Sequence, residues 1–210
     1  MKKRELYDLC SQRLAKAYPE AATELHFSSP YELLVAVMLS AQCTDKRVNM
    51  VTPALFKAFP TVQHMADATP EEIFPYVKSV SYPNAKSEHL AQMARQVCKR
   101  FNGVIPSTMD EMVSLPGVGR KTANVMLAVA FGGQAMPVDT HVFRVSHRIG
   151  LVPKSCTTPL SVEKELVRYF PQNILSTAHH WLILHGRYVC TARAPKCAVC
   201  CLNDFCYHCI

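Results

Sequence analysis

The chain has 210 residues, of which 49% are hydrophobic and 19% are charged, so it is long enough for one large or two small domains with ordinary cores. No apolar run reaches membrane-spanning length, and the charged N-terminus lacks the apolar centre of a signal peptide. We therefore expect a cytoplasmic protein with no membrane partner and no targeting segment. The formal charge of +7 suits a polyanionic partner.

Apolar residues recur at helical spacing through most of the chain, and this pattern predicts an all-α fold. The helices are expected over residues 3–18, 33–41, 46–59 and 90–101. Ser29 and Thr69 each begin a capping box, with proline next and glutamate three residues later, and Asn102-Gly103 predicts a helix end. No segment alternates apolar and polar residues for long enough to predict a strand.

A glycine-containing turn between two predicted helices stands out in the middle of the chain. A short helix over residues 107–114, with Ser107 as its N-cap, precedes the sequence LPGVGRK at 115–121 and a second helix that runs to Phe131. Two glycines let the backbone adopt positive φ and turn its amides toward a phosphate. This helix-hairpin-helix pattern predicts contact with a nucleic-acid backbone. Its candidate contacts are Leu115, Gly117, Val118, Gly119 and Arg120.

Arg120 and Lys121 at the start of the second helix argue against a purely structural turn. Cations at a helix N-terminus oppose the helix dipole, so placing two of them there costs stability. Residues that destabilise a helix without a structural benefit are expected at functional sites.

Beyond the hairpin, residues 138–144 read VDTHVFR, with Asp139 placed as the N-cap of a helix that runs to Ile149. Two further helices are predicted over residues 159–170 and 176–189. The chain therefore continues as helices up to its cysteine-rich segment.

Six of the ten cysteines lie between residues 190 and 209, which argues for a metal centre over a disulfide framework. Cys190, Cys197, Cys200 and Cys206 are close enough in sequence to surround one metal centre at small entropic cost. Their spacing suits zinc and an iron–sulfur cluster equally, and Cys201 or Cys209 could replace a neighbour. The intervening loop carries Arg193 and Lys196 and no acid, which suits a phosphate contact.

The hairpin, the VDTHVFR segment and the cysteine spacing together resemble the endonuclease III family, the bifunctional DNA glycosylases of the helix-hairpin-helix superfamily. The likeness covers nearly the whole chain, including residues 27–34 and 39–45. It implies two all-α domains with a DNA-binding cleft between them. One is a six-helix domain over 22–133 that contains the helix-hairpin-helix at about 108–131. The other joins 1–21 to 134–210 and carries a [4Fe-4S] cluster at 190–206.

The resemblance also implies the cluster ligands and the reaction. It assigns the cluster to Cys190, Cys197, Cys200 and Cys206, with Cys201 and Cys209 as bystanders. The expected activity is base excision repair of oxidised pyrimidines in double-stranded DNA. Lys121 attacks the sugar C1′, the base leaves, and a Schiff base leads to cleavage 3′ to the abasic site. Arg120 and the helix N-terminus disfavour the protonated amine, and Asp139 stabilises positive charge on the sugar.

Further DNA contacts follow from the same resemblance. His141 and Arg144 are expected near phosphates or behind Asp139, and Gln42 is expected to fill the gap left by a flipped base. The chain departs from the family at residues 81–86, SYPNAK, where Tyr82 stands in place of an intercalating leucine. An aromatic wedge still stacks between bases. We expect a monomer associated with a bacterial-type nucleoid.

Two other functions fit parts of this pattern. A non-catalytic DNA-binding protein that uses its metal cluster as a redox sensor would bind DNA without a covalent intermediate. A mismatch adenine glycosylase of the same superfamily would lack the Schiff-base lysine, so Lys121 argues against it.

Overall fold

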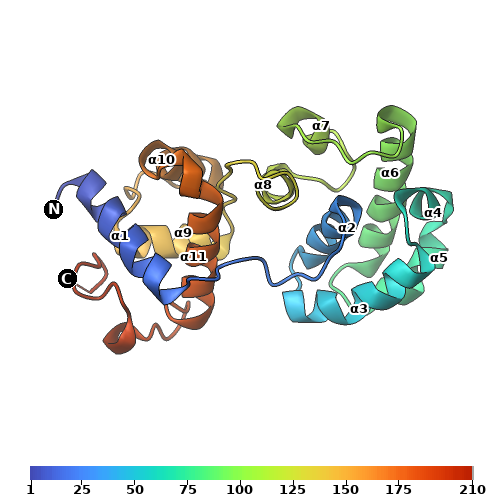
Figure 1. Cartoon of the computed structure of the whole chain (residues 1–210). Coiled ribbons are helices and arrows are strands. Elements are labelled where there is room, and N and C mark those ends of the chain that lie inside the picture. Colours follow the sequence, from blue (N-terminus) through green and yellow to red (C-terminus); the bar gives the residue numbers. More distant parts are fainter. Residues whose placement is uncertain (210) are drawn as a thin grey trace. The chain divides into compact units, whose positions relative to one another are not determined.

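The computed structural model describes residues 1–209, which form helices, turns and irregular segments with no strand among them (Figure 1). This confirms the all-α fold class. No helix in this part of the chain has the length and apolarity needed to cross a membrane. The α-helices are α1 (Lys3–Ala17), α2 (Pro30–Ser40), α3 (Asp45–Ala58), α4 (Val62–Asp67), α5 (Pro70–Val77), α6 (Pro83–Phe101), α7 (Met109–Val113), α8 (Arg120–Val129), α9 (Thr140–Ile149), α10 (Pro159–Tyr169) and α11 (Leu175–Tyr188).

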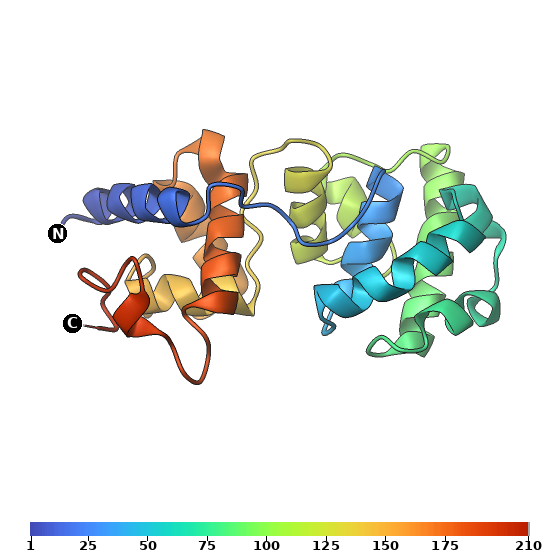
Figure 2. The same cartoon turned by 60° about the horizontal axis from the view of Figure 1, so that its bottom comes forward.

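The chain forms two compact units. The central unit is Glu24–Gly132 and holds α2 to α8, and the terminal unit joins Met1–Thr23 to Gly133–Ile210 and holds α1 with α9 to α11 (Figure 2). The predicted boundaries, 22 and 133, lie within two residues of these. Each unit has its own hydrophobic core.

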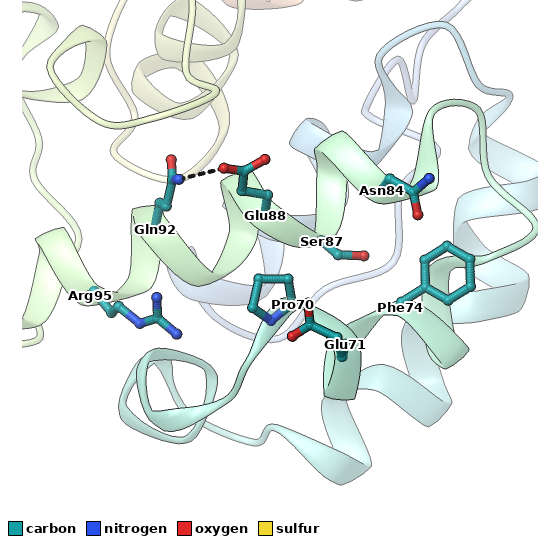
Figure 3. Close-up of a pocket in the computed structure, with 8 residues that line it drawn as sticks. All are labelled: Pro70, Glu71, Phe74, Asn84, Ser87, Glu88, Gln92 and Arg95. Atoms are coloured by element: carbon teal, nitrogen blue, oxygen red, sulfur yellow. Dashed lines mark hydrogen bonds between the residues drawn. The ribbon is translucent and has the colours of Figure 1, made fainter.

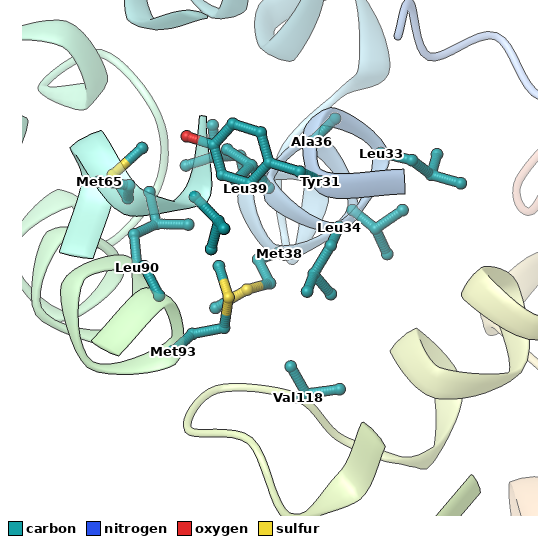
Figure 4. Packing of buried hydrophobic residues seen from close by; sticks show 14 of the residues in the cluster. Tyr31, Leu33, Leu34, Ala36, Met38, Leu39, Met65, Leu90, Met93 and Val118 are labelled. Carbon is teal, nitrogen blue, oxygen red and sulfur yellow. The ribbon is translucent and has the colours of Figure 1, made fainter. Parts of the chain in front are cut away.

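The core of the central unit is built around α2. Every residue from Leu33 to Leu39 is buried, and α2 packs against α3, α6 and α8 (Figure 4). The predicted Ser29 cap is present, since its hydroxyl accepts the Glu32 N–H at 3.2 Å. The second half of the predicted capping box is not formed, because the Glu32 carboxylate accepts both the N–H and the hydroxyl of Ser28 instead.

Other helix ends follow the sequence with small shifts. The Thr69 capping box is formed in full, and Asn102 ends α6 in the left-handed conformation, as predicted. The hairpin's first helix begins later than expected, because its cap is Thr108 and not Ser107. Helix α4 was not predicted; its six residues give too short an apolar pattern, although Thr61 caps it.

The terminal unit is closed by contacts between its two distant chain segments. The Tyr7 hydroxyl, on α1, donates a buried 2.9 Å hydrogen bond to the Leu151 carbonyl. Trp181 Nε1, on α11, donates to the Tyr18 carbonyl at 3.2 Å just beyond α1. Burial also raises the pKa of Tyr7, so its hydroxyl stays a donor. These bonds attach the first helix to a core made mainly by residues after Gly133.

We expect Tyr7→Phe to lower the free energy of unfolding of the terminal unit by about 1–2 kcal/mol, because the Leu151 carbonyl would stay buried without this donor. Trp181 is the single tryptophan and belongs to this unit, so its fluorescence during urea unfolding reports the change. Tyr31→Phe is the matched control, since Tyr31 donates an equivalent 2.9 Å bond to Phe59 in the central unit. Equal midpoints for Tyr7→Phe and parent would show that the hydroxyl adds no stability.

Candidate functional site

The glycine turn between α7 and α8 has two glycines with different roles. Gly117 has φ +75°, and a Cβ on it would lie 2.9 Å from His89 Cβ and 3.0 Å from Met38 Cε. Gly119 has φ −90°, and a Cβ there would meet no atom within 4 Å. The prediction that both glycines turn the chain with positive φ is therefore wrong for Gly119, which is the extended N-cap of α8. The fold requires a glycine at the first position and leaves open space at the second.

Leu115 and Val118 anchor this turn to the core. Their side chains are 2% and 5% exposed, and Val118 extends toward the α2 side chains (Figure 4). Both were predicted as DNA contacts. Because their side chains are buried, a contact from these residues is restricted to their backbone groups.

Arg120 and Lys121 occupy the first two positions of α8, and both are exposed. No acidic residue lies in the first turn to offset their charge. The first N–H groups of a helix also lack intrahelical partners. The start of α8 is therefore a strongly positive end of a helix, which suits a phosphate.

Gln42 and Tyr82 lie on two adjacent loops of the central unit, and both have strained backbones. Their φ angles are +54° and +56°, and Tyr82 is 63% exposed. The Ser81 hydroxyl donates to the Gln42 carbonyl at 2.6 Å and so joins the loops. Left-handed conformations in non-glycine residues cost about 1–3 kcal/mol and cluster at functional sites. The structure therefore brings these two predicted contacts together.

Lys86 supports the loop that carries Gln42, and the sequence analysis did not identify it. This residue is 8% exposed, and its amine donates to the Leu39 and Ala41 carbonyls, both at 2.7 Å. Burial lowers the pKa of the amine. A possible signal was its place on the apolar face of α6, four residues before Leu90.

In the terminal unit, Asp139 caps α9 as predicted. Its Oδ1 accepts the N–H groups of His141 at 2.9 Å and Val142 at 2.8 Å. Its Oδ2 lies 3.1 Å from His141 Nδ1. Both side chains are partly exposed, at 16% for Asp139 and 31% for His141. The imidazole therefore lies beside the carboxylate oxygen that does not cap the helix.

Arg144, on α9, attaches this helix to the last turn of α11 and to the segment that follows it. Arg144 Nη2 donates to the Gly186 carbonyl at 2.9 Å, and its Nε donates to the Cys190 carbonyl at 3.2 Å. Gly186 allows this approach, since a Cβ there would lie 2.9 Å from His141 Cβ. Arg144 was predicted near phosphates or behind Asp139. In the structure, its guanidinium binds backbone carbonyls.

Arg148, one turn further along α9, holds the basic loop, and the sequence analysis missed it. Its guanidinium donates to the carbonyls of Thr191 at 2.7 Å and Ala192 at 2.8 Å. Its Nη1 also donates to Cys190 Sγ at 3.5 Å. Arg193 and Lys196 are exposed on this loop. The contacts of Arg148 therefore join the basic loop to the first cysteine.

The cysteine segment lines a narrow cavity of about 20 Å³. All its cysteines are free thiols. The cavity-lining cysteines are Cys190, Cys197, Cys200, Cys206 and Cys209. Two nitrogens lie near Cys200 Sγ: the Leu202 N–H donates to it at 3.4 Å, and His185 Nε2 lies at 3.4 Å. Nitrogen donors of this kind stabilise metal-bound thiolates.

The state of His185 follows from its surroundings. Burial lowers its pKa to about 4, so the ring is neutral near pH 7. The Tyr18 hydroxyl lies 3.1 Å from Nδ1, and Cys200 Sγ lies 3.4 Å from Nε2. Burial raises the Tyr18 pKa to about 12, so its hydroxyl is protonated near pH 7. Burial also raises the pKa of Cys200 to about 11, so a metal must displace a proton there.

Two other arrangements offer no place for the predicted chemistry. Among residues 1–209, no three His, Cys, Asp or Glu side chains are placed to hold one metal ion. An open groove between α5 and α6 contains none of the predicted site residues (Figure 3). There Gln92 donates to Glu88 at 3.0 Å, and Arg95 donates to the Ala66 and Ala68 carbonyls. Arg95 therefore joins α6 to the segment before α5.

Comparison with known proteins relates these features to a family. A model for HhH-GPD superfamily base excision DNA repair proteins matches residues 35–172. Endonuclease III of Rickettsia felis is 43% identical over 192 residues, or 91% of this chain and 89% of that protein. Endonuclease III of Escherichia coli strain K12 is 43% identical over 194 residues, or 92% of this chain and 91% of that protein. A trapped endonuclease III–DNA covalent intermediate, an estranged-adenine complex, aligns with TM-score 0.94 and 40% identity over 99% of this chain and 97% of that one.

We expect Gly117→Ala to lower the free energy of unfolding of the central unit by about 1–3 kcal/mol, because alanine would combine an unfavourable positive φ with contacts near 3 Å. Gly119→Ala is the matched control and should cost less than about 1 kcal/mol, the penalty of alanine at an N-cap. Thermal unfolding followed by circular dichroism compares the two. A larger loss for Gly119→Ala would contradict the roles given to these glycines.

Proposed function

The chain belongs to the endonuclease III family of base excision DNA repair proteins, and on this premise we propose that Lys121 and Asp139 are its catalytic residues. This membership confirms the resemblance and makes the protein a DNA glycosylase and abasic-site lyase. The proposed substrate is double-stranded DNA that carries an oxidised pyrimidine or an abasic site. We propose that a monomer acts on it, at the nucleoid.

The position of Lys121 is the observation that carries this proposal. Its amine is exposed in the first turn of α8, beside Arg120 and without an acidic neighbour in that turn. Such a position adds nothing to helix stability and suits an amine that must give up its proton to act as a nucleophile. The solved relative trapped as a covalent intermediate with DNA supports a covalent route.

The Lys121 nitrogen bonds to C1′ of the flipped nucleotide, and the bond from C1′ to the base breaks. The base leaves with that electron pair and takes up a proton. Loss of the nitrogen's proton and opening of the sugar ring give an imine between Lys121 and C1′. Removal of a C2′ proton breaks the C3′–O bond, so the strand is cut 3′ to the lesion, and water then releases the lysine.

Asp139 is proposed to stabilise positive charge on the sugar and to carry protons during these steps. One of its oxygens caps α9, and the other lies beside the His141 ring. His141 therefore acts as a positioning residue for the carboxylate. Arg144 holds α9 to the end of α11 through the Gly186 carbonyl and acts behind the site in this proposal.

Gln42 and Tyr82 are proposed to replace the flipped base and to stack beside the gap. Their loops are joined by the Ser81 hydrogen bond, and the exposed Tyr82 ring offers a flat aromatic surface. The strained backbone at both residues supports a functional role. The Tyr82 side chain in place of leucine would change which base is preferred opposite the lesion.

Phosphate contacts are proposed at two places. In the central unit, the backbone of the turn from Leu115 to Gly119 and the start of α8 would hold one phosphate, and the open space at Gly119 supports its close approach. In the terminal unit, Arg193 and Lys196 would contact another, on the loop that Arg148 holds. Two solved relatives are complexes of endonuclease III with DNA, which supports DNA as the partner.

The residues of the cysteine cavity fit the cluster that the family likeness implies. Cys190, Cys197, Cys200 and Cys206 are free thiols around one cavity, with N–H donors directed at the sulfurs of Cys190 and Cys200. When bound, the cluster supplies four iron–thiolate bonds that would fix the basic loop.

Borohydride trapping on a duplex with one thymine glycol tests the proposed nucleophile. We expect a covalent adduct with the parent, and a loss on the order of 10³-fold or more with Lys121→Gln, which has no nucleophilic amine. Lys46→Gln is the matched control, since Lys46 is an exposed lysine at the second position of α3. Lack of an adduct with a parent that binds the duplex would overturn the proposal, and lack of base release as well would favour a DNA-binding redox sensor. Release of adenine from a mismatched duplex without an adduct would favour the mismatch glycosylase.

Asp139→Asn should keep the fold, because asparagine caps a helix as well as aspartate does, and should lose base release by on the order of 10²-fold or more. Single-turnover release of thymine glycol measures the rate, and thermal unfolding checks the fold. Equal rates for the variant and the parent would remove Asp139 from the reaction.

A further inference from the structure

Lys86 contacts both of the loops that carry the proposed gap-filling residues. Its amine donates to the Leu39 and Ala41 carbonyls, both at 2.7 Å, and Gln42 follows directly. Its backbone N–H donates to the Tyr82 carbonyl at 3.1 Å, in the first turn of α6. One buried residue therefore joins the end of α2 to the start of α6.

A charged amine suits this position on two grounds. A donor that carries a charge makes shorter and stronger hydrogen bonds than a neutral one, and both bonds of the Lys86 amine are 2.7 Å long. A cation is also favoured beside the last carbonyl groups of a helix, which lack partners within it. Loss of the amine would leave the Leu39 and Ala41 carbonyls without this donor.

The two loops need such support because their exposed residues have strained backbones. Gln42 and Tyr82 combine positive φ with exposed side chains. Conformations of this kind persist only where the surrounding structure fixes them. The Ser81 hydroxyl fixes the Gln42 carbonyl directly. Lys86 fixes the Ala41 carbonyl on one loop and the Tyr82 carbonyl on the other.

We infer that Lys86 is a positioning residue that holds Gln42 and Tyr82 in their gap-filling arrangement before DNA binds, an inference that rests on the roles proposed for those two residues. Side chains that are already arranged for binding lose less conformational entropy when the partner arrives. This gain offsets part of the cost of unstacking the flipped base. Lys86 therefore acts on base release and on the preference for the opposite base, through the two loops.

Paired rates on two kinds of substrate test this role. Single-turnover base release is measured on duplexes with thymine glycol opposite adenine or guanine, and strand cleavage on a duplex with an abasic site, where no base has to be unstacked. We expect Lys86→Met to slow base release by on the order of tenfold and abasic-site cleavage by less than about threefold. The ratio of the adenine and guanine rates should change in the direction that Gln42→Ala gives. A merely structural loss would lower every rate by one factor.

Arg95→Met is the matched control. Arg95 also lies on α6, and its guanidinium donates to the carbonyls of Ala66 at 3.0 Å and Ala68 at 2.7 Å, at the end of α4. These carbonyls are outside the loops of Gln42 and Tyr82, so this variant should keep the parent's ratios of rates. Thermal unfolding of each variant sets a temperature at which all of them are folded.

A double variant separates action through Gln42 from a general effect. If Lys86 acts through this residue, the loss of base release in Gln42→Ala/Lys86→Met should be at least about threefold smaller than the product of the two single losses. Lys86→Gln keeps an N–H donor without the charge, so its rates should lie between those of the parent and Lys86→Met. It takes the place of Lys86→Met if methionine prevents folding.

Hydrogen exchange in the protein without DNA gives a second readout. The Cys43 N–H donates to the Ser40 carbonyl at 3.0 Å, across the loop that contains Gln42. This N–H should exchange faster in Lys86→Met than in the parent and at the parent's rate in Arg95→Met. Mass spectrometry of the peptide that contains Cys43 measures the rates.

The outcomes separate this inference from the proposed function. If Gln42→Ala leaves the ratio of the adenine and guanine rates unchanged, the gap-filling role fails and the inference fails with it. If Gln42→Ala changes that ratio and Lys86→Met does not, the inference alone fails. It is also overturned if Lys86→Met lowers all rates by one factor, if the two single losses multiply, or if the Cys43 N–H exchanges as in the parent.

Discussion

The first N–H groups and the last carbonyl groups of a helix have no partners within the helix, and the fold must supply them elsewhere. In this protein, side chains far away in the sequence meet this need next to candidate site residues. The Lys86 amine binds carbonyls at the end of α2, just before Gln42. Arg144 binds the Gly186 carbonyl at the end of α11. A helix end that is held in this way gives the residue beyond it a fixed position.

The first N–H groups of α8 and of α9 need partners outside their helices, and the two helix starts differ in what lies beside these groups. Asp139 satisfies two N–H groups of α9 and adds a negative charge where the helix dipole favours one. At α8 the cap is Gly119, which has no side chain, and two cations follow. The first arrangement stabilises its helix, whereas the second places positive charge where the helix dipole favours a negative one. This contrast is the physical basis for assigning phosphate binding to the hairpin.

Several candidate site residues lower the stability of the fold. The left-handed backbone of Gln42 and Tyr82 and the cations of α8 each cost free energy that a neutral sequence would avoid. The cores of the two units offset such costs, since helices such as α2 are almost completely buried. In the terminal unit, Arg148 has a comparable role. Its contacts to the basic loop and to Cys190 couple the shape of that loop to the cysteine cavity.

The sequence by itself determined the features that depend on near neighbours along the chain. Helical spacing, the caps at Ser29, Thr69 and Asp139, and the cations after Gly119 are local, so they could be read directly. The tertiary structure decided which residues support them. Lys86 and Leu39 are 47 residues apart and Arg148 and Thr191 are 43 apart, and no local pattern encodes such pairs. Likewise, the spacing of the cysteines offered six thiols, and the folded segment alone distinguished Cys209, which lines the cavity, from Cys201, which does not.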